Sequence, residues 1–292
     1  MNQPVLSQSD YDAFQLYLES ACGIVLGNNK HYLVTSRLNR LTQEFTFSSL
    51  GDLLASLQKG HDKRLRESVI NAMTTNETSW FRDIYPFEML KKSIFPELSK
   101  QKPKPNPLRI WSAASSTGQE SYSISMTTSE YQLANPGALP GRVEIVGTDI
   151  SSRVVKSARE GKYDELSMAR GLSDERKKRF FTDNKDGGWT INKDIGGRTR
   201  FTELNLLNSY TLMGRFDIIF CRNVLIYFSS EMKTDILQRM AAILNPGGFL
   251  FLGGSESPTG YCNNYEMMRM PEGVVYRLKQ KPDAHAKLFP SR

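Results

Sequence analysis

Residues 109–123 constrain the fold of this chain more than any other stretch, and they read RIWSAASSTGQESYS. A short apolar strand around Ile110 and Trp111 runs into small residues and Gly118, and a helix then opens at Gln119. A loop without bulky side chains lets its backbone approach a ligand at the amino end of the helix. The pattern therefore predicts an α/β protein that holds a nucleotide-like ligand.

A second apolar strand, residues 143–146, ends at Gly147, Thr148 and Asp149. An acid at the carboxyl end of the second strand is well placed to accept hydrogen bonds from ribose hydroxyls. A nicotinamide dehydrogenase fits less well, because the loop at 113–118 has one glycine where a dinucleotide fingerprint has three. Ordinary α/β packing remains an alternative, since short motifs of this kind give false matches.

Strand and helix patterns alternate after residue 107. Near-continuous apolar runs predict strands at 108–112, 143–148, 216–221 and 248–252, and helical spacing predicts helices at 119–133, 152–159 and 231–244. This alternation predicts a Rossmann-like, doubly wound, mostly parallel sheet. Glycines at 187–188 and 196–197 bracket β-prone pieces at 189–192 and 198–201, so we predict a small antiparallel β insertion at about 180–204.

The first 73 residues differ from the rest in texture. Apolar residues recur at helical spacing, as in Tyr11, Phe14 and Leu18, and predict an all-α domain with Ser9 and Ser48 as helix caps. Residues 74–83 are interpreted as a join between domains rather than a core element, and 100–107 as a proline-rich surface loop. The second domain is predicted to span 74–292, with a disordered tail at 279–292.

Length and composition fit a two-domain globular protein of 292 residues with 24% charged residues. The first residues show no basic segment followed by an apolar core, and no apolar run approaches the length of a membrane span, so a cytoplasmic protein is expected. Cys22, Cys221 and Cys262 lie far apart without metal-ligand spacing. We predict reduced, buried thiols and no metal site.

The formal charge of +7 suggests an anionic partner, and nucleic acid is the common inference. However, the first 73 residues carry seven acids and seven bases, so the excess lies further along the chain. Lys30, Arg37 and Arg40 follow one side of the second predicted helix, away from its apolar stripe. This basic stripe is a candidate to dock an acidic helix, although a solvated surface would show the same pattern.

Taken together, the motifs resemble the CheR family of chemotaxis receptor methyltransferases over residues 10–278. The resemblance rests on five motifs in order: TTNETSWFR at 74–82, the loop motif at 109–123, VGTDIS at 146–151, FDIIFCRNVLIYF at 216–228 and LNPGGFLFLGGSES at 244–257.

The resemblance implies an enzyme that uses S-adenosylmethionine to methylate glutamate side chains of methyl-accepting chemotaxis receptors. The products would be glutamate methyl esters and S-adenosylhomocysteine, and the membrane would be involved only through the receptor. A carboxylate is already a nucleophile at neutral pH, so the site has to align it rather than deprotonate it. That agrees with the lack of an evident histidine or cysteine base.

By position in the matched motifs, the resemblance also implies roles for individual residues. Arg82 and Tyr227 match the pair that orients the methyl donor and the incoming carboxylate. The matched cofactor contacts are Asn76, Thr78, Arg82, Glu120, Asp149, Asn205, Leu206, Arg222 and Asn223. The stripe of Lys30, Arg37 and Arg40 is the candidate reader of the receptor's acidic methylation helices.

The sequence departs from the family pattern at four positions: Ser115, Gln119, Ser121 and Gly254. Of these, Gln119 stands where the family often has a second acid, which puts cofactor affinity in question. The β insertion resembles the family's receptor-binding subdomain but is short, so binding of a receptor carboxyl-terminal tether stays open.

Two other functions are compatible with a fold that binds S-adenosylmethionine. One is a nucleic-acid methyltransferase, although the chain lacks an NPPY-like tetrapeptide to seat a flipped base. The other is a sensor that binds S-adenosylmethionine without transferring its methyl group.

Overall fold

A computed structural model of the chain describes residues 6–101, 106–139, 142–185 and 187–280. A seven-stranded sheet has the order β6-β2-β1-β7-β8-β10-β9. Its strands are β1 (Leu108–Ala113), β2 (Val143–Asp149), β6 (Thr199–Glu203), β7 (Phe216–Cys221), β8 (Leu244–Leu252), β9 (Tyr265–Met270) and β10 (Gly273–Leu278). The strands from β6 to β8 pair in parallel, and β10 pairs antiparallel with β8 and β9. The predicted mostly parallel sheet is confirmed.

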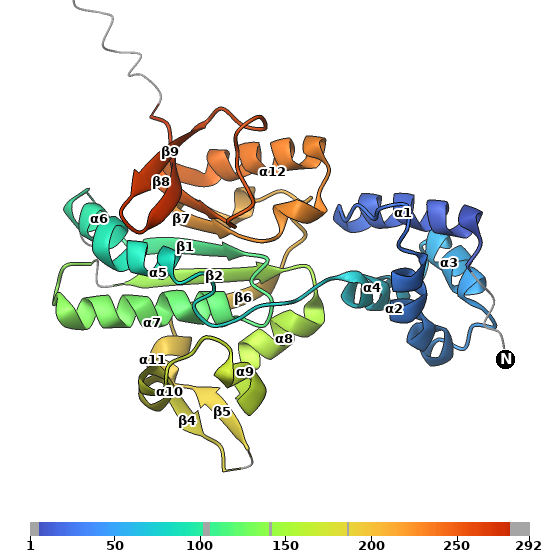
Figure 1. Cartoon of the computed structure of the whole chain (residues 1–292), viewed down its shortest axis with the longest axis horizontal. Helices are drawn as coiled ribbons and strands as arrows, with labels where there is room; N and C mark the ends of the chain where they lie inside the picture. The colour runs from blue at the N-terminus through green and yellow to red at the C-terminus, as the bar shows by residue number, and fades with distance from the viewer. Residues whose placement is uncertain (1–5, 102–105, 140–141, 186, 281–292) are drawn as a thin grey trace, which may run out of the picture.

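Helices cover both faces of this sheet (Figure 1). The helix α7 (Gln119–Ala134) lies on one face, and α12 (Ser230–Ile243) lies on the other. Successive side chains of a strand point to opposite faces, so Ile110 belongs to the apolar core on one side and its neighbour Trp111 to the core on the other. Burial on both faces explains why the parallel strands are almost uniformly apolar.

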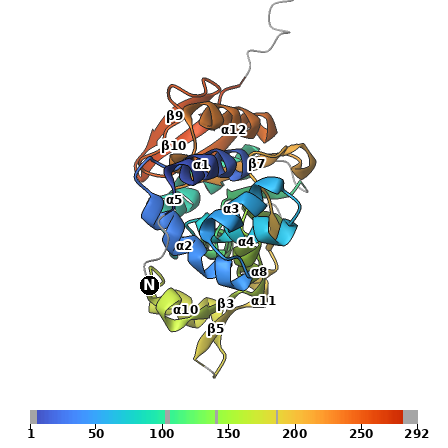
Figure 2. The ribbon, with the colours of Figure 1, turned by 90° about the vertical axis from the view of Figure 1, so that its right-hand side faces the viewer.

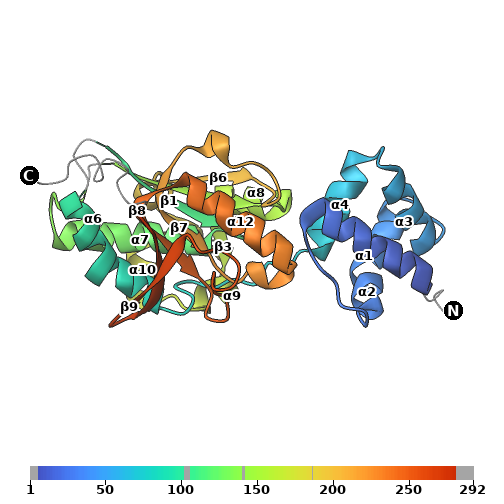
Figure 3. The ribbon, with the colours of Figure 1, turned by 90° about the horizontal axis from the view of Figure 1, so that it is seen from above.

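The amino-terminal helices are α1 (Gln8–Cys22), α2 (His31–Glu44), α3 (Leu50–Lys59) and α4 (Lys63–Met73). They share an apolar core of their own and lie beyond the carboxyl ends of β1 and β2 (Figures 1 and 3). The all-α prediction is confirmed, but the predicted caps are wrong. Ser7 and Ser49 accept the hydrogen bonds from the first turns of α1 and α3, in place of Ser9 and Ser48.

Shorter elements complete the chain. They are α5 (Tyr85–Met89), the π-helix η1 (Leu90–Ile94), α6 (Phe95–Gln101), α8 (Ser152–Glu160), α9 (Glu165–Ala169), α10 (Asp174–Phe180), α11 (Lys193–Gly196), and the 3₁₀ turns η2 (Thr211–Met213) and η3 (Leu225–Tyr227). A separate antiparallel sheet has the order β3-β5-β4, with β3 (Lys162–Asp164), β4 (Phe181–Asp183) and β5 (Gly188–Ile191). Figure 2 shows this small sheet below the helical bundle.

A small antiparallel sheet is confirmed, but the predicted bounds of 180–204 are wrong at both ends, because β3 at 162–164 belongs to it and the predicted strand at 198–201 does not. Those residues begin β6, which pairs in parallel with β2 in the large sheet. Strand propensity alone does not say which sheet a strand joins, because pairing depends on long-range packing. Parts of two other predictions lie outside the described residues: the loop over 102–105 and the tail over 281–292.

Over the described ranges, no helix combines the length and the apolar composition needed to cross a membrane.

Candidate active site

The loop after β1 turns sharply and brings its backbone against the carboxyl end of β2. Ala114 and Ser116 have φ values of 56° and 51°, and Gly118 has 96°. The Ser115 amide donates to a β2 carbonyl at 2.8 Å. A Cβ at Gly118 would lie 3.1 Å from Ala158 Cβ. Glycine therefore allows both the left-handed backbone conformation and the close packing at this position. The loop therefore stays thin beside the end of the sheet.

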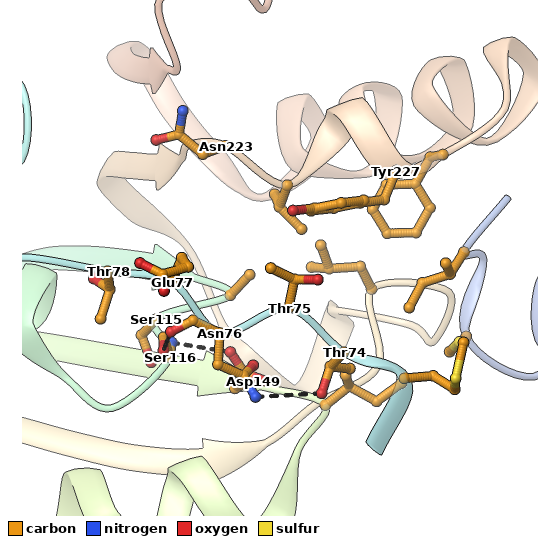
Figure 4. Close-up of a pocket in the computed structure, with 18 of the residues that line it drawn as sticks. Thr74, Thr75, Asn76, Glu77, Thr78, Ser115, Ser116, Asp149, Asn223 and Tyr227 are labelled. Carbon is orange, nitrogen blue, oxygen red and sulfur yellow. Dashed lines mark hydrogen bonds between the residues drawn. The ribbon is translucent and has the colours of Figure 1, made fainter. Parts of the chain in front are cut away.

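Asp149 is the buried acid at this edge, with 6% of its surface exposed. Its Oδ2 accepts from Ser116 N at 2.9 Å (Figure 4). Its Oδ1 accepts from Ser151 N at 3.0 Å. Burial raises the pKa of Asp149 above its ordinary value, and the Ser151 and Ser116 amides offset part of that rise. Each carboxylate oxygen retains acceptor capacity, so the side chain can still receive hydroxyl donors from a ligand.

The segment at 74–84 runs from the helical bundle along one side of this edge. Ser116 Oγ donates to Asn76 O at 2.8 Å, which ties the segment to the loop after β1. Asn76 Nδ2 in turn donates to Thr74 Oγ1 at 3.3 Å. In Figure 4, Thr74 to Thr78 line one side of the pocket and Tyr227 lies on the opposite side. These hydrogen bonds hold the predicted contact Asn76 at the pocket wall, and the predicted contact Thr78 lines the same wall.

Arg82 lies in strained backbone. Its neighbours Phe81, Asp83 and Ile84 have φ values of 47°, 67° and 53°, which residues with side chains rarely adopt. Arg82 itself is partly exposed, and its Nη1 donates to Glu77 O at 3.2 Å. Such strain costs on the order of 1–3 kcal/mol per residue and persists only where the surrounding structure holds it in place. The surroundings therefore fix the path of the chain at Arg82.

Trp80 packs into the core and helps to hold this strained backbone in place. It is 1% exposed, and its ring packs edge-on against Tyr163 and Phe181, with centroid distances of 4.8 and 5.2 Å. Its Nε1 donates to Ser167 O at 3.1 Å. The prediction that 74–83 is a join rather than a core element is wrong for Trp80, because burial of a large indole against the small sheet makes it part of the core.

Arg222 follows β7 and joins this segment to the large sheet. Its side chain is 1% exposed. Nη1 donates to Glu120 Oε2 at 2.9 Å, and Nη2 donates to Asp83 Oδ2 at 2.6 Å and to Arg82 O at 3.0 Å. Glu120 also accepts from Ser112 Oγ at 2.8 Å. The Arg222 guanidinium is thus largely engaged by protein groups, and its position holds the backbone of Arg82 near the end of β7.

Asn223 and Tyr227 belong to the turn that follows Arg222. Asn223 has a φ of 58°, a conformation that asparagine tolerates better than most residues. The Tyr227 carbonyl accepts from Val25 N at 2.9 Å, so this turn also contacts the loop between α1 and α2. Tyr227 is partly exposed and lines the pocket from above in Figure 4. The bundle and the sheet therefore both contact the backbone that carries Tyr227.

Asn205 makes a second connection to the bundle. Its Nδ2 donates to Ala21 O at 2.8 Å, and its Oδ1 accepts from Leu207 N at 3.0 Å. Leu206, next to it, is buried. The Asn205 amide thus already serves protein partners, which indicates a role in shaping the pocket beside any contact with a ligand.

These elements enclose a cavity of about 270 Å³. Every predicted catalytic and cofactor-binding residue lines it: Asn76, Thr78, Arg82, Glu120, Asp149, Asn205, Leu206, Arg222, Asn223 and Tyr227. The structure brings these residues together, and their individual roles remain predictions. Sequence reasoning missed an apolar wall that includes Ile24, Val25 and Leu26. The signal was an apolar run in a loop between helices, where polar residues are usual.

Three buried polar atoms at this cavity have no hydrogen-bond partner among the described residues: Ser115 Oγ, Arg222 Nε and Asn223 Oδ1. Leaving such groups unpaired costs about 1–3 kcal/mol each. These atoms are themselves covered, so the fit to a ligand rests on Asp149, whose carboxylate can still accept from ribose hydroxyls, and on the thin loop beside it. The residues present therefore fit an adenosine-containing cofactor.

The predicted basic stripe divides into two parts. Lys30 and Arg40 are exposed, whereas Arg37 is half-buried and donates to Met73 O at 2.6 Å and to Thr75 Oγ1 at 3.1 Å. Lys30 and Arg37 line the cavity, and Arg40 does not. Arg37 therefore anchors the start of the connecting segment. Of the predicted stripe, only Lys30 and Arg40 are exposed and available to contact a receptor helix.

The cysteines and histidine of this region have packing roles. Cys22, Cys221 and Cys262 are free and buried as predicted, and burial raises the pKa of Cys22 to about 11. His31 stacks on Tyr11 with ring centroids 3.8 Å apart. Within the described ranges, no three His, Cys, Asp or Glu side chains are placed to hold a metal ion together.

Two family models match the chain, and together they cover most of it. Residues 76–274 match the description "CheR methyltransferase, SAM binding domain", and residues 9–74 match "CheR methyltransferase, all-alpha domain".

Curated relatives match over nearly their whole length. A chemotaxis protein methyltransferase of Vibrio parahaemolyticus is 50% identical over 279 residues, covering 96% of this chain and all of the relative. Chemotaxis protein methyltransferase 1 of Pseudomonas aeruginosa is 50% identical over 273 residues, which cover 94% of this chain and 99% of that protein. The Salmonella typhimurium chemotaxis protein methyltransferase is 34% identical, with coverage of 94% and 92%.

Proposed function

The chain belongs to the CheR family of chemotaxis methyltransferases, which use S-adenosylmethionine, and from that premise we propose that it methylates glutamate side chains of chemoreceptors. The products are glutamate methyl esters and S-adenosylhomocysteine. One observation carries the proposal. The cavity at the carboxyl edge of the sheet gathers a buried acid, Asp149, and the partly exposed side chains of Arg82 and Tyr227.

Asp149 and the loop after β1 would hold the cofactor, with Ser115 and Asn223 as further hydrogen-bonding partners. S-adenosylmethionine supplies an electrophilic methyl group when bound. The protein's own contribution is alignment, because a carboxylate needs no base to become nucleophilic at neutral pH. Arg82 is suited to attract and orient an incoming carboxylate, and the Tyr227 hydroxyl is suited to donate a hydrogen bond beside it.

The helical domain, residues 1–73, would recognise the receptor, and residues 74–292 would carry the methyltransferase site. Lys30 and Arg40 present positive charge on α2, and Lys30 also lines the cavity. Complementary charge steers encounter and fixes register more than it adds affinity. The partner is therefore the acidic methylation helices of a chemoreceptor, in the cytoplasm, with the membrane involved only through the receptor.

Transfer of a labelled methyl group to receptor-containing membranes tests this proposal. Label should appear on the receptor and be released by mild alkali as methanol, because esters hydrolyse readily. Alkali-stable label on nucleic acid in the same extract would favour a nucleic-acid methyltransferase. Binding of S-adenosylhomocysteine with no transfer to any membrane preparation would favour a sensor that does not catalyse transfer.

A further inference from the structure

Glu256 is a buried carboxylate in the turn after β8, outside the wall of the candidate site. Its backbone lies within the motif at 244–257, to which no role was assigned. The carboxylate makes no ion pair with a described residue. A buried charge of this kind is costly unless hydrogen bonds satisfy it, so the number and identity of its donors determine what it does.

Four backbone amides converge on this carboxylate. Oε2 accepts from Asn223 N and from Gly253 N, both at 2.7 Å. Oε1 accepts from Val224 N at 2.9 Å and from Ile226 N at 3.3 Å. Three of the four donors belong to the turn that carries Asn223 and Tyr227. A single side chain on the β8 turn therefore holds the backbone of the β7 turn along most of its length.

The packing around Gly253 leaves little room for a side chain at that position. A Cβ at Gly253 would lie 2.7 Å from Glu256 Oε2 and 2.8 Å from Asn223 Nδ2. Gly253 thus has to be glycine for the carboxylate and Asn223 to approach each other. Asn223 also has a positive φ of 58°, and the hydrogen bond from its amide to Glu256 helps to hold the turn in that conformation.

We propose that Glu256 is a positioning residue for the methyl transfer, which sets the placement of Asn223 and Tyr227 through the backbone of their turn. This inference rests on the proposed function, because the reaction that it serves is the one proposed above. Glu256 acts without touching the ligand. The backbone amides of a turn have no helix or strand partner, and the Glu256 carboxylate supplies the acceptors that they need.

Glu256→Gln is the direct test, since the amide keeps the size of the side chain but replaces one acceptor oxygen with a donor. We expect kcat to fall about 100-fold, as a small misplacement of aligned groups can cost, with the KM for receptor unchanged. Asp217→Asn is the matched control. Asp217 is also buried and accepts a backbone amide, from Arg109 at 2.8 Å, but it lies at the opposite end of β7. It should lose stability with kcat unchanged.

A double-mutant cycle with Tyr227→Phe separates positioning from general damage. If Glu256 works through Tyr227, Glu256→Gln should cost much less in the Tyr227→Phe background than in the wild type, because residues that act as a unit are not additive. Additive losses in the two variants, or an unchanged kcat in Glu256→Gln, would overturn the proposal.

Amide hydrogen exchange gives a readout that does not require activity. In Glu256→Gln, residues 223–226 and 253 should exchange faster, while the amides of β1 and β2 keep their protection. Unaltered exchange in that turn would contradict the role of Glu256 even if the wild type transferred no methyl group. If Glu256→Gln does not fold, Glu256→Asp takes its place. Failure of both to fold while Asp217→Asn folds would assign Glu256 to folding alone, against the proposal.

Discussion

Asp149 is the single residue on which cofactor binding depends most in this account. Replacing it with alanine removes the acceptor for ligand hydroxyls and leaves the amides of Ser116 and Ser151 unpaired. We expect the affinity for S-adenosylhomocysteine to fall by about 1.5–3 kcal/mol, the range for hydrogen bonds to charged groups. Titration calorimetry measures this directly, and a folded variant that binds normally would refute the assignment.

The same residue predicts a pH dependence. Burial raises the pKa of Asp149, so its carboxyl takes up a proton at a higher pH than an exposed aspartate would. Above that pKa the ionised form weakens the folded state, and this cost disappears as protonation proceeds with falling pH. Ligand hydroxyls need the ionised acceptor, so affinity should decline as the pH falls through the raised pKa.

Binding isotherms between neutral and mildly acidic pH check this prediction. Asp149→Asn is the control, because its side chain does not titrate, and its weaker affinity should stay flat over the same range. An equal decline in both proteins would show that another group controls the pH dependence.

At the residue scale, the sequence predicted which side chains gather at the cavity but not how they are engaged. The position of Asp149 was predictable, because a residue at the carboxyl end of a parallel strand lies at the edge of the sheet where ligands bind. The engagement of Arg222 with Glu120 and Asp83 was not, since those partners come from segments far apart in the chain. The same is true of Arg37, whose contact with Met73 depends on how two helices pack.

At the scale of elements, the connecting segment is the feature on which the site depends. Trp80 anchors it to the small sheet, and Arg176 of α10 lies over the Phe81 ring at 3.7 Å while Glu130 binds its guanidinium at 2.7 Å. The small sheet and α10 therefore support the backbone that carries Arg82. Loosening this anchor should affect the site as well as the fold.

Trp80→Phe tests this coupling. The smaller ring leaves a gap, and Ser167 O loses its donor, so we expect roughly 1–3 kcal/mol less stability. Affinity for S-adenosylhomocysteine should also weaken, because the predicted cofactor contacts Asn76 and Thr78 lie on the same segment. Trp189→Phe, in the small sheet but partly exposed, should change neither value much. Lower stability of Trp80→Phe with unaltered binding would separate the anchor from the site.

Elements with a strong local signal were predicted well from the sequence. The buried parallel strands and α7, α8 and α12 lie within a few residues of their predicted bounds. The hairpin of β9 and β10 went unpredicted, and β6 was assigned to the wrong sheet. These strands are short or partly exposed, so tertiary pairing rather than their own composition decides where they lie.

At the scale of the whole molecule, the net charge of +7 matters less than where exposed charge lies. If α2 reads acidic receptor helices, Lys30→Glu with Arg40→Glu should slow receptor methylation at low salt and reduce its salt dependence. Affinity for S-adenosylhomocysteine should not change with Arg40→Glu alone, because Arg40 does not line the cavity. Methylation rates at several salt concentrations measure this.

Lys59→Glu with Lys63→Glu is the matched control for that experiment, because it changes the net charge by the same amount at exposed lysines that lie at the end of α3 and the start of α4. It should slow methylation much less than the double variant on α2. Equal effects would mean that overall charge, and not the surface of α2, governs the encounter.

The bundle and the sheet meet at the cavity, and a crystal structure with S-adenosylhomocysteine at saturating concentration shows whether the product of the reaction binds there. We expect density in the cavity, with the ribose hydroxyls on the Asp149 carboxylate and the sulfur facing the side where Arg82 and Tyr227 lie. An empty cavity under those conditions, or product bound elsewhere on the chain, would contradict this expectation.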